Sequence, residues 1–201
     1  MEHMRRKPPF LPLLDSQDCL LVAIDVQETF LNKLSPEHRQ PLLYRILWVT
    51  RVARWLDLPI IATAEEVDRL GGIHSQYQDG LPLEARVFNK MTFGLTYEAE
   101  IMSAVRKTGR RTVVLLGLET DVCVAHSALG LMEQGFRVAV VSDATGSPGA
   151  AHDDGLRRIR EAGGLVISLR ALFYEWLRTV EATRRFRAEN EDAPSPDELP
   201  S

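Results

Sequence analysis

Short apolar runs alternate with longer amphipathic stretches along most of the chain. Six runs rich in Val, Ile and Leu have the length of strands buried on both faces: residues 20–26, 58–63, 85–90, 112–118, 137–143 and 164–169. Between them, helix-start prolines and helix-end glycines delimit four predicted helices: residues 35–57, 95–109, 121–135 and 147–163. The alternation predicts an α/β fold, a three-layer α/β/α doubly wound (Rossmann-like) arrangement with a six-stranded, mostly parallel sheet.

The length of 201 residues and the hydrophobic share of 45 % fit one globular domain. We expect this domain over residues 18–186, after an N-terminal segment at residues 1–17. Residues 187–201, "RAENEDAPSPDELPS", are acidic and poor in large apolar side chains, which predicts a mobile tail. Residues 65–84 lack clear periodicity, and connections of that length often cover active sites.

The charge and the apolar content of the chain indicate which kinds of partner it binds. The formal net charge is −4, with 24 basic and 28 acidic residues spread along the chain, so we expect neither nucleic acid nor a membrane surface as partner. There is no apolar run long enough to span a bilayer, which predicts a cytoplasmic protein. The apolar stretch at residues 42–56 favours a homo-oligomer.

Three reactive side chains fall at predicted strand ends, where open α/β sheets bind their ligands. Asp25 lies near the end of the first strand, Lys90 at the end of the third, and Cys123 just past the fourth. A desolvated Asp25 carboxylate needs a cation, which a lysine from a neighbouring strand end supplies. A thiol in the first turn of a helix is favoured as thiolate by the helix dipole. The other cysteine, Cys19, opens an apolar run and is interpreted as core packing.

Four segments carry a family resemblance: "AIDVQETF" (23–30), "FNKMTFG" (88–94), "GLETDVCVAHSALGLMEQGFRVAVVSDATGS" (117–147) and "IREAGGLVIS" (159–168). They resemble the isochorismatase-like cysteine hydrolases, which include nicotinamidases and N-carbamoylsarcosine amidohydrolases. The resemblance implies a catalytic triad of Asp25 as general base, Lys90 as positioning cation and Cys123 as nucleophile. It also implies an oxyanion hole built from the backbone N–H groups of Glu119 and Cys123, with a cis peptide bond between Leu118 and Glu119.

The activity implied by this resemblance is hydrolysis of a C–N bond in a small amide, ureido or imide-like substrate through a thioester-type intermediate. Gln27 is a candidate for substrate binding or for bonding loop backbone, and Phe30 and Phe93 for walling the pocket or filling the core. Thr120 and Asp121 are expected to cap the helix that Cys123 begins. A non-catalytic binding or scaffold protein and a thiol redox sensor remain alternatives.

No cofactor and no metal ion are predicted. Nicotinamidases place an Asp-x-His pair after the second strand to bind a metal, and this chain has none there. Glu65, Glu66, Asp68 and His74 offer donor atoms, but their spacing favours a solvated acidic turn. The sequence therefore looks most similar to the metal-free, functionally uncharted branch of the family.

Overall fold

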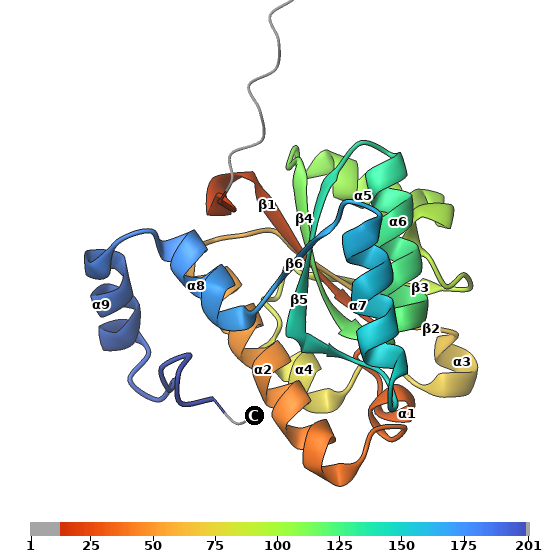
Figure 1. Ribbon diagram of the computed structural model, residues 1–201, viewed down its shortest axis with the longest axis horizontal. Coiled ribbons are helices and arrows are strands. Elements are labelled where there is room, and N and C mark those ends of the chain that lie inside the picture. Colours follow the sequence, from red (N-terminus) through yellow and green to blue (C-terminus); the bar gives the residue numbers. More distant parts are fainter. Residues whose placement is uncertain (1–12, 200–201) are drawn as a thin grey trace, which may run out of the picture.

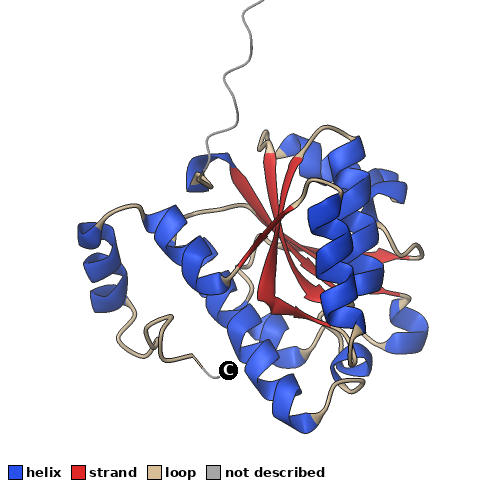
Figure 2. Ribbon diagram, viewed as in Figure 1, coloured by secondary structure: helices blue, strands red, loops and turns tan. Residues whose placement is uncertain are grey.

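The computed structural model describes residues 13–199 and has the predicted α/β class (Figure 1). Its sheet has six strands in the order β3-β2-β1-β4-β5-β6, and all neighbouring strands are parallel. The strands are β1 (Cys19–Ile24), β2 (Ile60–Glu65), β3 (Arg86–Lys90), β4 (Thr112–Leu118), β5 (Arg137–Gly146) and β6 (Leu165–Ile167). Helices cover both faces of the sheet (Figure 2), which confirms the three-layer prediction.

The register of the central strands brings the sequence motifs to one edge. β1 pairs with both β2 and β4, and Glu65 at the end of β2 lies opposite Lys90 at the end of β3. Gly117 pairs with Ile24 with a φ of 113°, and a Cβ there would lie 1.9 Å from the Ile24 carbonyl oxygen. Only glycine permits this close approach of backbones where the chain leaves the sheet.

The chain's own helices cover the two sheet faces. α2 (Pro36–Trp55) and α8 (Leu169–Leu177) pack on one face and α5 (Ala99–Lys107), α6 (Ala125–Glu133) and α7 (Ala151–Glu161) on the other. The remaining helices are α1 (Glu28–Leu31), α3 (Val67–Leu70), α4 (Ser75–Gly80) and α9 (Val180–Glu189), with 3₁₀ turns at Ser16–Asp18 and Leu95–Tyr97.

The apolar character of α2, which favoured an oligomer, is accounted for within one chain. The Trp48 ring lies 5.1 Å from Phe173 of α8 and 6.1 Å from Phe186 of α9, and Trp55 lies 5.4 Å from Phe186. The apolar side chains of residues 42–56 are therefore no argument for a partner subunit, and the homo-oligomer stays a prediction. Sequence periodicity did not predict α8 and α9, which cover these side chains.

Strand β3 departs from the prediction that every strand is buried on both faces. It forms the edge of the sheet, and Arg86, Val87 and Asn89 are exposed while Phe88 and Lys90 are buried. An edge strand has a neighbour on one side only, so a short apolar run does not ensure burial.

The described part of the tail lies along α2. The Trp48 indole N–H donates to the Pro194 carbonyl oxygen at 3.1 Å, and Arg51 pairs with Asp192 at 2.8 Å. The mobility of this tail and the three segment boundaries stay predictions, and residues 1–12 and 200–201 lie outside the described range.

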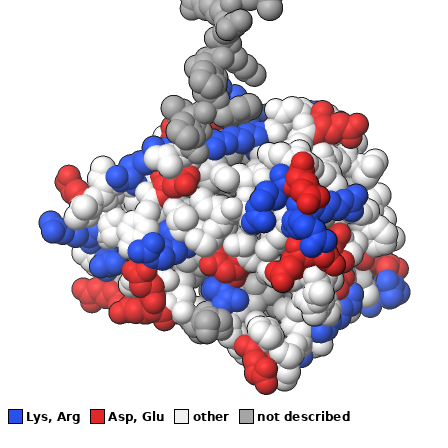
Figure 3. Space-filling view, in the orientation of Figure 1, with Lys and Arg blue, Asp and Glu red and all other residues white. Residues whose placement is uncertain are grey.

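The surface carries mixed charge. On the face seen in Figure 3, Lys and Arg side chains lie among Asp and Glu side chains. Within residues 13–199, no helix has the length and apolar character needed to cross a bilayer.

Candidate active site

The carboxyl ends of β1, β3 and β4 bring Asp25, Lys90 and Cys123 together. Asp25 follows β1, Lys90 closes β3, and Cys123 lies in a π-helix, Thr120–Val124, that follows β4. The Lys90 ammonium nitrogen lies 2.7 Å from Asp25 Oδ2 and 3.6 Å from Cys123 Sγ. The side chains of Asp25 and Lys90 are fully buried, and Cys123 is 1 % exposed. The ion pair and the thiol therefore share a site screened from bulk water.

Asp25 is held by backbone and side-chain bonds to β2. Its N–H donates to the Thr63 carbonyl oxygen at 3.1 Å, and the Thr63 hydroxyl donates to Asp25 Oδ1 at 2.8 Å. Asp25 has a φ of 48°, a left-handed conformation that turns the chain sharply out of β1. Such a conformation in a non-glycine residue is costly and persists where surrounding contacts fix it.

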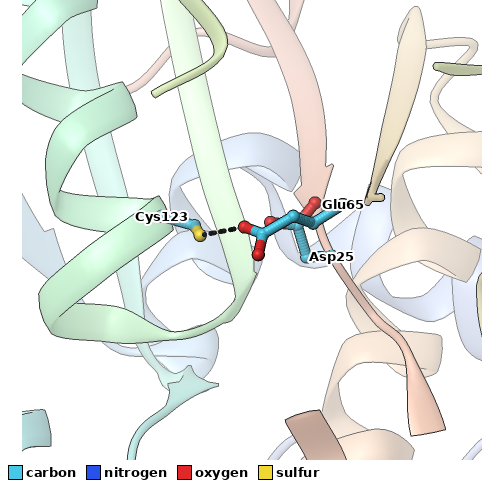
Figure 4. Close-up of side chains that lie close together, drawn as sticks. All are labelled: Asp25, Glu65 and Cys123. Atoms are coloured by element: carbon cyan, nitrogen blue, oxygen red, sulfur yellow. Dashed lines mark hydrogen bonds between the residues drawn. The ribbon is translucent and has the colours of Figure 1, made fainter. Parts of the chain in front are cut away.

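Glu65 is the fourth ionisable side chain in the site, after Asp25, Lys90 and Cys123. The Cys123 thiol donates to Glu65 Oε2 at 3.2 Å, and Lys90 Nζ lies at 3.2 Å from the same oxygen. Figure 4 shows the Glu65 carboxylate pointing toward the Cys123 sulfur, and the donor atoms of Asp25, Glu65 and Cys123 all lie within 4.8 Å of one another. The Glu65 side chain is 14 % exposed, the most open of the four.

The prediction of a solvated acidic turn is wrong for Glu65. β2 continues two residues beyond the apolar run that ends at Thr63, so Glu65 lies on the same face of the strand as Thr63 and points into the site. Glu66 instead has a φ of 45° and pairs with Arg69 at 2.6 Å. Strand alternation extended past Thr63 was the signal that identifies Glu65 from sequence.

Gln27 fixes the backbone on either side of the Glu65 side chain. Its Oε1 accepts from the Glu65 N–H at 2.6 Å, and its Nε2 donates to the Glu65 carbonyl at 3.0 Å and the Gly71 carbonyl at 2.6 Å. Of the two roles considered for Gln27, the structure shows the bonding of loop backbone. Substrate contact by Gln27 stays a prediction.

Burial sets the protonation state of the thiol. Burial, together with the charge of Asp25, raises the pKa of Cys123, and Lys90 only partly offsets this. The sequence favoured a thiolate at this helix terminus, but desolvation and the Asp25 charge act in the opposite direction and raise the pKa of the thiol. In the resting site Cys123 is therefore a thiol.

Burial and neighbouring charges act in opposite directions on the pKa values of Asp25 and Lys90. Burial raises the pKa of Asp25, and Lys90 and Thr63 partly oppose that rise. Burial alone lowers the pKa of Lys90, but the charge of Asp25 and of the neighbouring Cys123 and Glu65 outweighs it, so the pKa of Lys90 is raised. Lys90 therefore stays charged and supplies the positive charge of the site.

Donor atoms of Asp25, Glu65 and Cys123 lie within 4.8 Å of one another, close enough for one metal ion. Lys90 Nζ contacts the Asp25 and Glu65 carboxylates and the Cys123 sulfur, so an ammonium group already occupies the position of a cation. Of the other donors considered, His74 lies apart from this group and pairs with Glu28 at 3.2 Å. A metal-free site stays the prediction for this arrangement.

Residues 19–171, more than half of the chain, match the family model for the isochorismatase domain. The chain belongs to the isochorismatase family of hydrolases. Within it, the secreted isochorismatase effector Isc1 of Phytophthora sojae is 30 % identical over 160 residues, 78 % of this chain and 75 % of that protein.

Solved structures of this family have the same fold. YcaC from Pseudomonas aeruginosa, solved with hexane-2,5-diol and covalent acrylamide, is 25 % identical with a TM-score of 0.79, covering 88 % of this chain and 90 % of that one. YcaC from Escherichia coli, described as an octameric hydrolase of unknown specificity, is 23 % identical with a TM-score of 0.80, covering 91 % and 92 %.

The remaining residues implied by the isochorismatase-family resemblance are Glu119, Phe30 and Phe93. The Leu118–Glu119 peptide bond is cis, as expected. The Glu119 side chain pairs with Lys33 at 2.9 Å. Phe30 is buried in the core, whereas Phe93 is 55 % exposed and packs edge-on against His126. The backbone oxyanion hole at Glu119 and Cys123 and the wall role of Phe93 stay predictions.

Thr120 and Asp121 do not cap the helix, contrary to expectation. Thr120 Oγ1 bonds His152 Nδ1 at 2.9 Å, and the Ser147 hydroxyl donates to Asp121 Oδ1 at 2.6 Å. A Cβ on Gly155 of α7 would lie 2.7 Å from the Asp121 backbone. In this isochorismatase-family chain these residues therefore dock the π-helix that carries Cys123 against α7 and the loop before it.

Proposed function

We propose that this protein is a cysteine hydrolase that cleaves a C–N bond of a small, neutral amide, ureido or imide-like compound. The observation that carries the proposal is the buried Cys123 thiol, which lies 3.6 Å from the Lys90 ammonium and 3.2 Å from a carboxylate. A nucleophile next to a base and an orienting cation is the arrangement needed for covalent catalysis. The covalent acrylamide in Pseudomonas aeruginosa YcaC supports small neutral amides as ligands of this fold.

The proposed hydrolysis uses each member of the Asp25–Lys90–Cys123 triad for a different task. The deprotonated sulfur attacks the carbonyl carbon while Lys90 stabilises the developing negative charge. Backbone N–H groups at Glu119 and Cys123 receive the oxyanion, and expulsion of the amine leaves a thioester that water hydrolyses. By the family resemblance, Asp25 is the general base, and its ion pair with Lys90 at 2.7 Å holds the ammonium beside the sulfur.

The experiment that tests the function is a turnover screen. Purified protein is incubated with small amides, ureido compounds and imides, and released ammonia or amine is measured. The proposal predicts release from at least one neutral compound by the wild type. Binding of such compounds without release from any of them would favour the non-catalytic binding protein instead.

The charges beside the sulfur favour neutral reagents. Within residues 13–199, Asp25 and Glu65 form ion pairs with Lys90 alone, so an anionic group brought to the thiol is repelled. We predict that the ratio of the iodoacetamide to the iodoacetate alkylation rate at Cys123 exceeds that of free N-acetylcysteine by about 10-fold. Peptide mass spectrometry at one pH and ionic strength measures both rates. Equal ratios for Cys123 and the free thiol would remove this argument for neutral substrates.

A homo-oligomer is part of the proposal. Five exposed apolar or aromatic side chains lie on or near the edge strand β3: Leu83, Val87, Met91, Phe93 and Tyr97. The octameric YcaC of Escherichia coli supports assembly in this fold. Light scattering at micromolar concentration is expected to give a mass above the 22.6 kDa of one chain, and a mass equal to it would contradict assembly. A cytoplasmic location stays a prediction.

A further inference from the structure

The proton transfers of the proposed reaction have two candidate carboxylates, Asp25 and Glu65. Asp25 Oδ1 accepts from the Thr63 hydroxyl at 2.8 Å, and Asp25 Oδ2 forms the ion pair with Lys90 Nζ at 2.7 Å. Glu65 Oε2 accepts a hydrogen bond from the Cys123 thiol at 3.2 Å. A second carboxylate therefore lies within hydrogen-bond distance of the sulfur.

Exposure separates the two carboxylates further. Asp25 and Lys90 are fully buried, while the Glu65 side chain is 14 % exposed. A leaving amine and a hydrolytic water must both pass between solvent and the thioester. Of the two carboxylates, only Glu65 is in contact with solvent.

The Gln27 side-chain amide fixes the backbone of Glu65. Its oxygen accepts from the Glu65 N–H, and its nitrogen donates to the carbonyl oxygens of Glu65 and of Gly71, which lies in the connection after β2. A carboxylate that exchanges protons with a small substrate needs this positioning, because general acid–base catalysis requires hydrogen-bond distances.

Resting on the proposed function, in which Asp25 takes the thiol proton, we propose that Glu65 is a further catalytic residue, the carboxylate that exchanges protons with the hydrolytic water and the sulfur when the thioester is cleaved.

In the first half of the reaction the thiol proton moves to Asp25, the sulfur lone pair forms the C–S bond, and the carbonyl π electrons move to oxygen. When the carbonyl re-forms, the C–N bond breaks and Asp25 gives its proton to the leaving nitrogen. Water then gives a proton to Glu65 and forms the C–O bond, the C–S bond breaks, and the proton returns to sulfur.

The test compares the wild type with Glu65→Gln and the matched control Glu66→Gln, using p-nitrophenyl acetate as an acylating probe. Nitrophenolate leaves without a proton, so this ester isolates hydrolysis of the thioester. Glu65→Gln is expected to become acetylated at Cys123 and to lose the acetyl group about 10²-fold or more slowly than the other two proteins. Intact mass spectrometry follows both steps. Hydroxylamine, which attacks without a general base, is expected to release the acetyl group from all three at similar rates.

A thioester that is hydrolysed equally fast in Glu65→Gln and Glu66→Gln would overturn the proposal. Failure of the proposed function is seen separately, as a wild-type protein that is never acetylated at Cys123. In that case the pH profile of iodoacetamide alkylation still decides the role of Glu65. Removing its charge lowers the pKa of the thiol, because Glu65 raises it in the wild type. The pH profile of Glu65→Gln is therefore expected to move to lower pH. A profile unchanged from the wild type would show that Glu65 does not act on the Cys123 thiol.

Discussion

Replacement of Cys123 by alanine is expected to lower hydrolysis of any amide that the wild type turns over by at least about 10³-fold. The physical reason is that the sulfur is the atom that bonds to the carbonyl carbon, and no neighbouring group replaces it. Lys90, Asp25 and Glu65 position or exchange charge around that sulfur. The measurement is steady-state amine release, with thermal unfolding recorded for both proteins.

Cys19 provides the matched control for this substitution. It is fully buried in β1, and burial raises the pKa of Cys19 to about 11. Cys19→Ala is therefore expected to keep wild-type turnover, and Cys19 is expected to resist iodoacetamide near neutral pH. Wild-type turnover in Cys123→Ala would show that hydrolysis, if present, takes place elsewhere.

Replacement of Lys90 by methionine is expected to lower the free energy of unfolding by about 3–5 kcal/mol near pH 8. Without Lys90, the fully buried Asp25 has no cation beside it. Because burial raises the pKa of Asp25, the carboxyl group is neutral at low pH and the loss is small there. The loss then grows as pH rises above the ordinary aspartate pKa of about 3.9, since ionisation favours the unfolded chain. Urea unfolding at several pH values measures this trend.

Two further variants test whether the stability loss in Lys90→Met comes from the unpaired charge of Asp25. The double variant Asp25→Asn/Lys90→Met removes the unpaired charge and is expected to recover most of the lost stability. Lys33→Met breaks a pair with Glu119 whose lysine is 44 % exposed, and is expected to cost no more than about 1 kcal/mol. A Lys90→Met protein as stable as the wild type at pH 8 would contradict the buried ion pair.

The sequence was sufficient to predict the sheet and the three reactive residues for a physical reason. Parallel strands with crossovers put all strand ends on one edge, so Asp25, Lys90 and Cys123 had to meet once the strands were placed. The family motifs around them added the cis Leu118–Glu119 bond, which the structure contains.

Other features depend on contacts that periodicity does not report. Strand alternation continued past Thr63 puts Glu65 on the site face of β2, but its register opposite Lys90, which periodicity does not report, is what places it beside the other site residues. The raised pKa of Cys123 comes from desolvation in three dimensions and opposes the local effect of the helix terminus. In the same way, the apolar face of α2 indicated a second subunit because α8 and α9, which cover it, were not predicted.

In the proposed reaction Cys123 forms a covalent acyl intermediate. This is tested by peptide mass spectrometry of wild-type protein quenched in acid after brief exposure to p-nitrophenyl acetate. An acetyl group is expected on the Cys123 peptide and none on Cys19, and further incubation at neutral pH before the quench is expected to remove it. Acetylation confined to surface lysines, with Cys123 unmodified in folded protein, would contradict this intermediate.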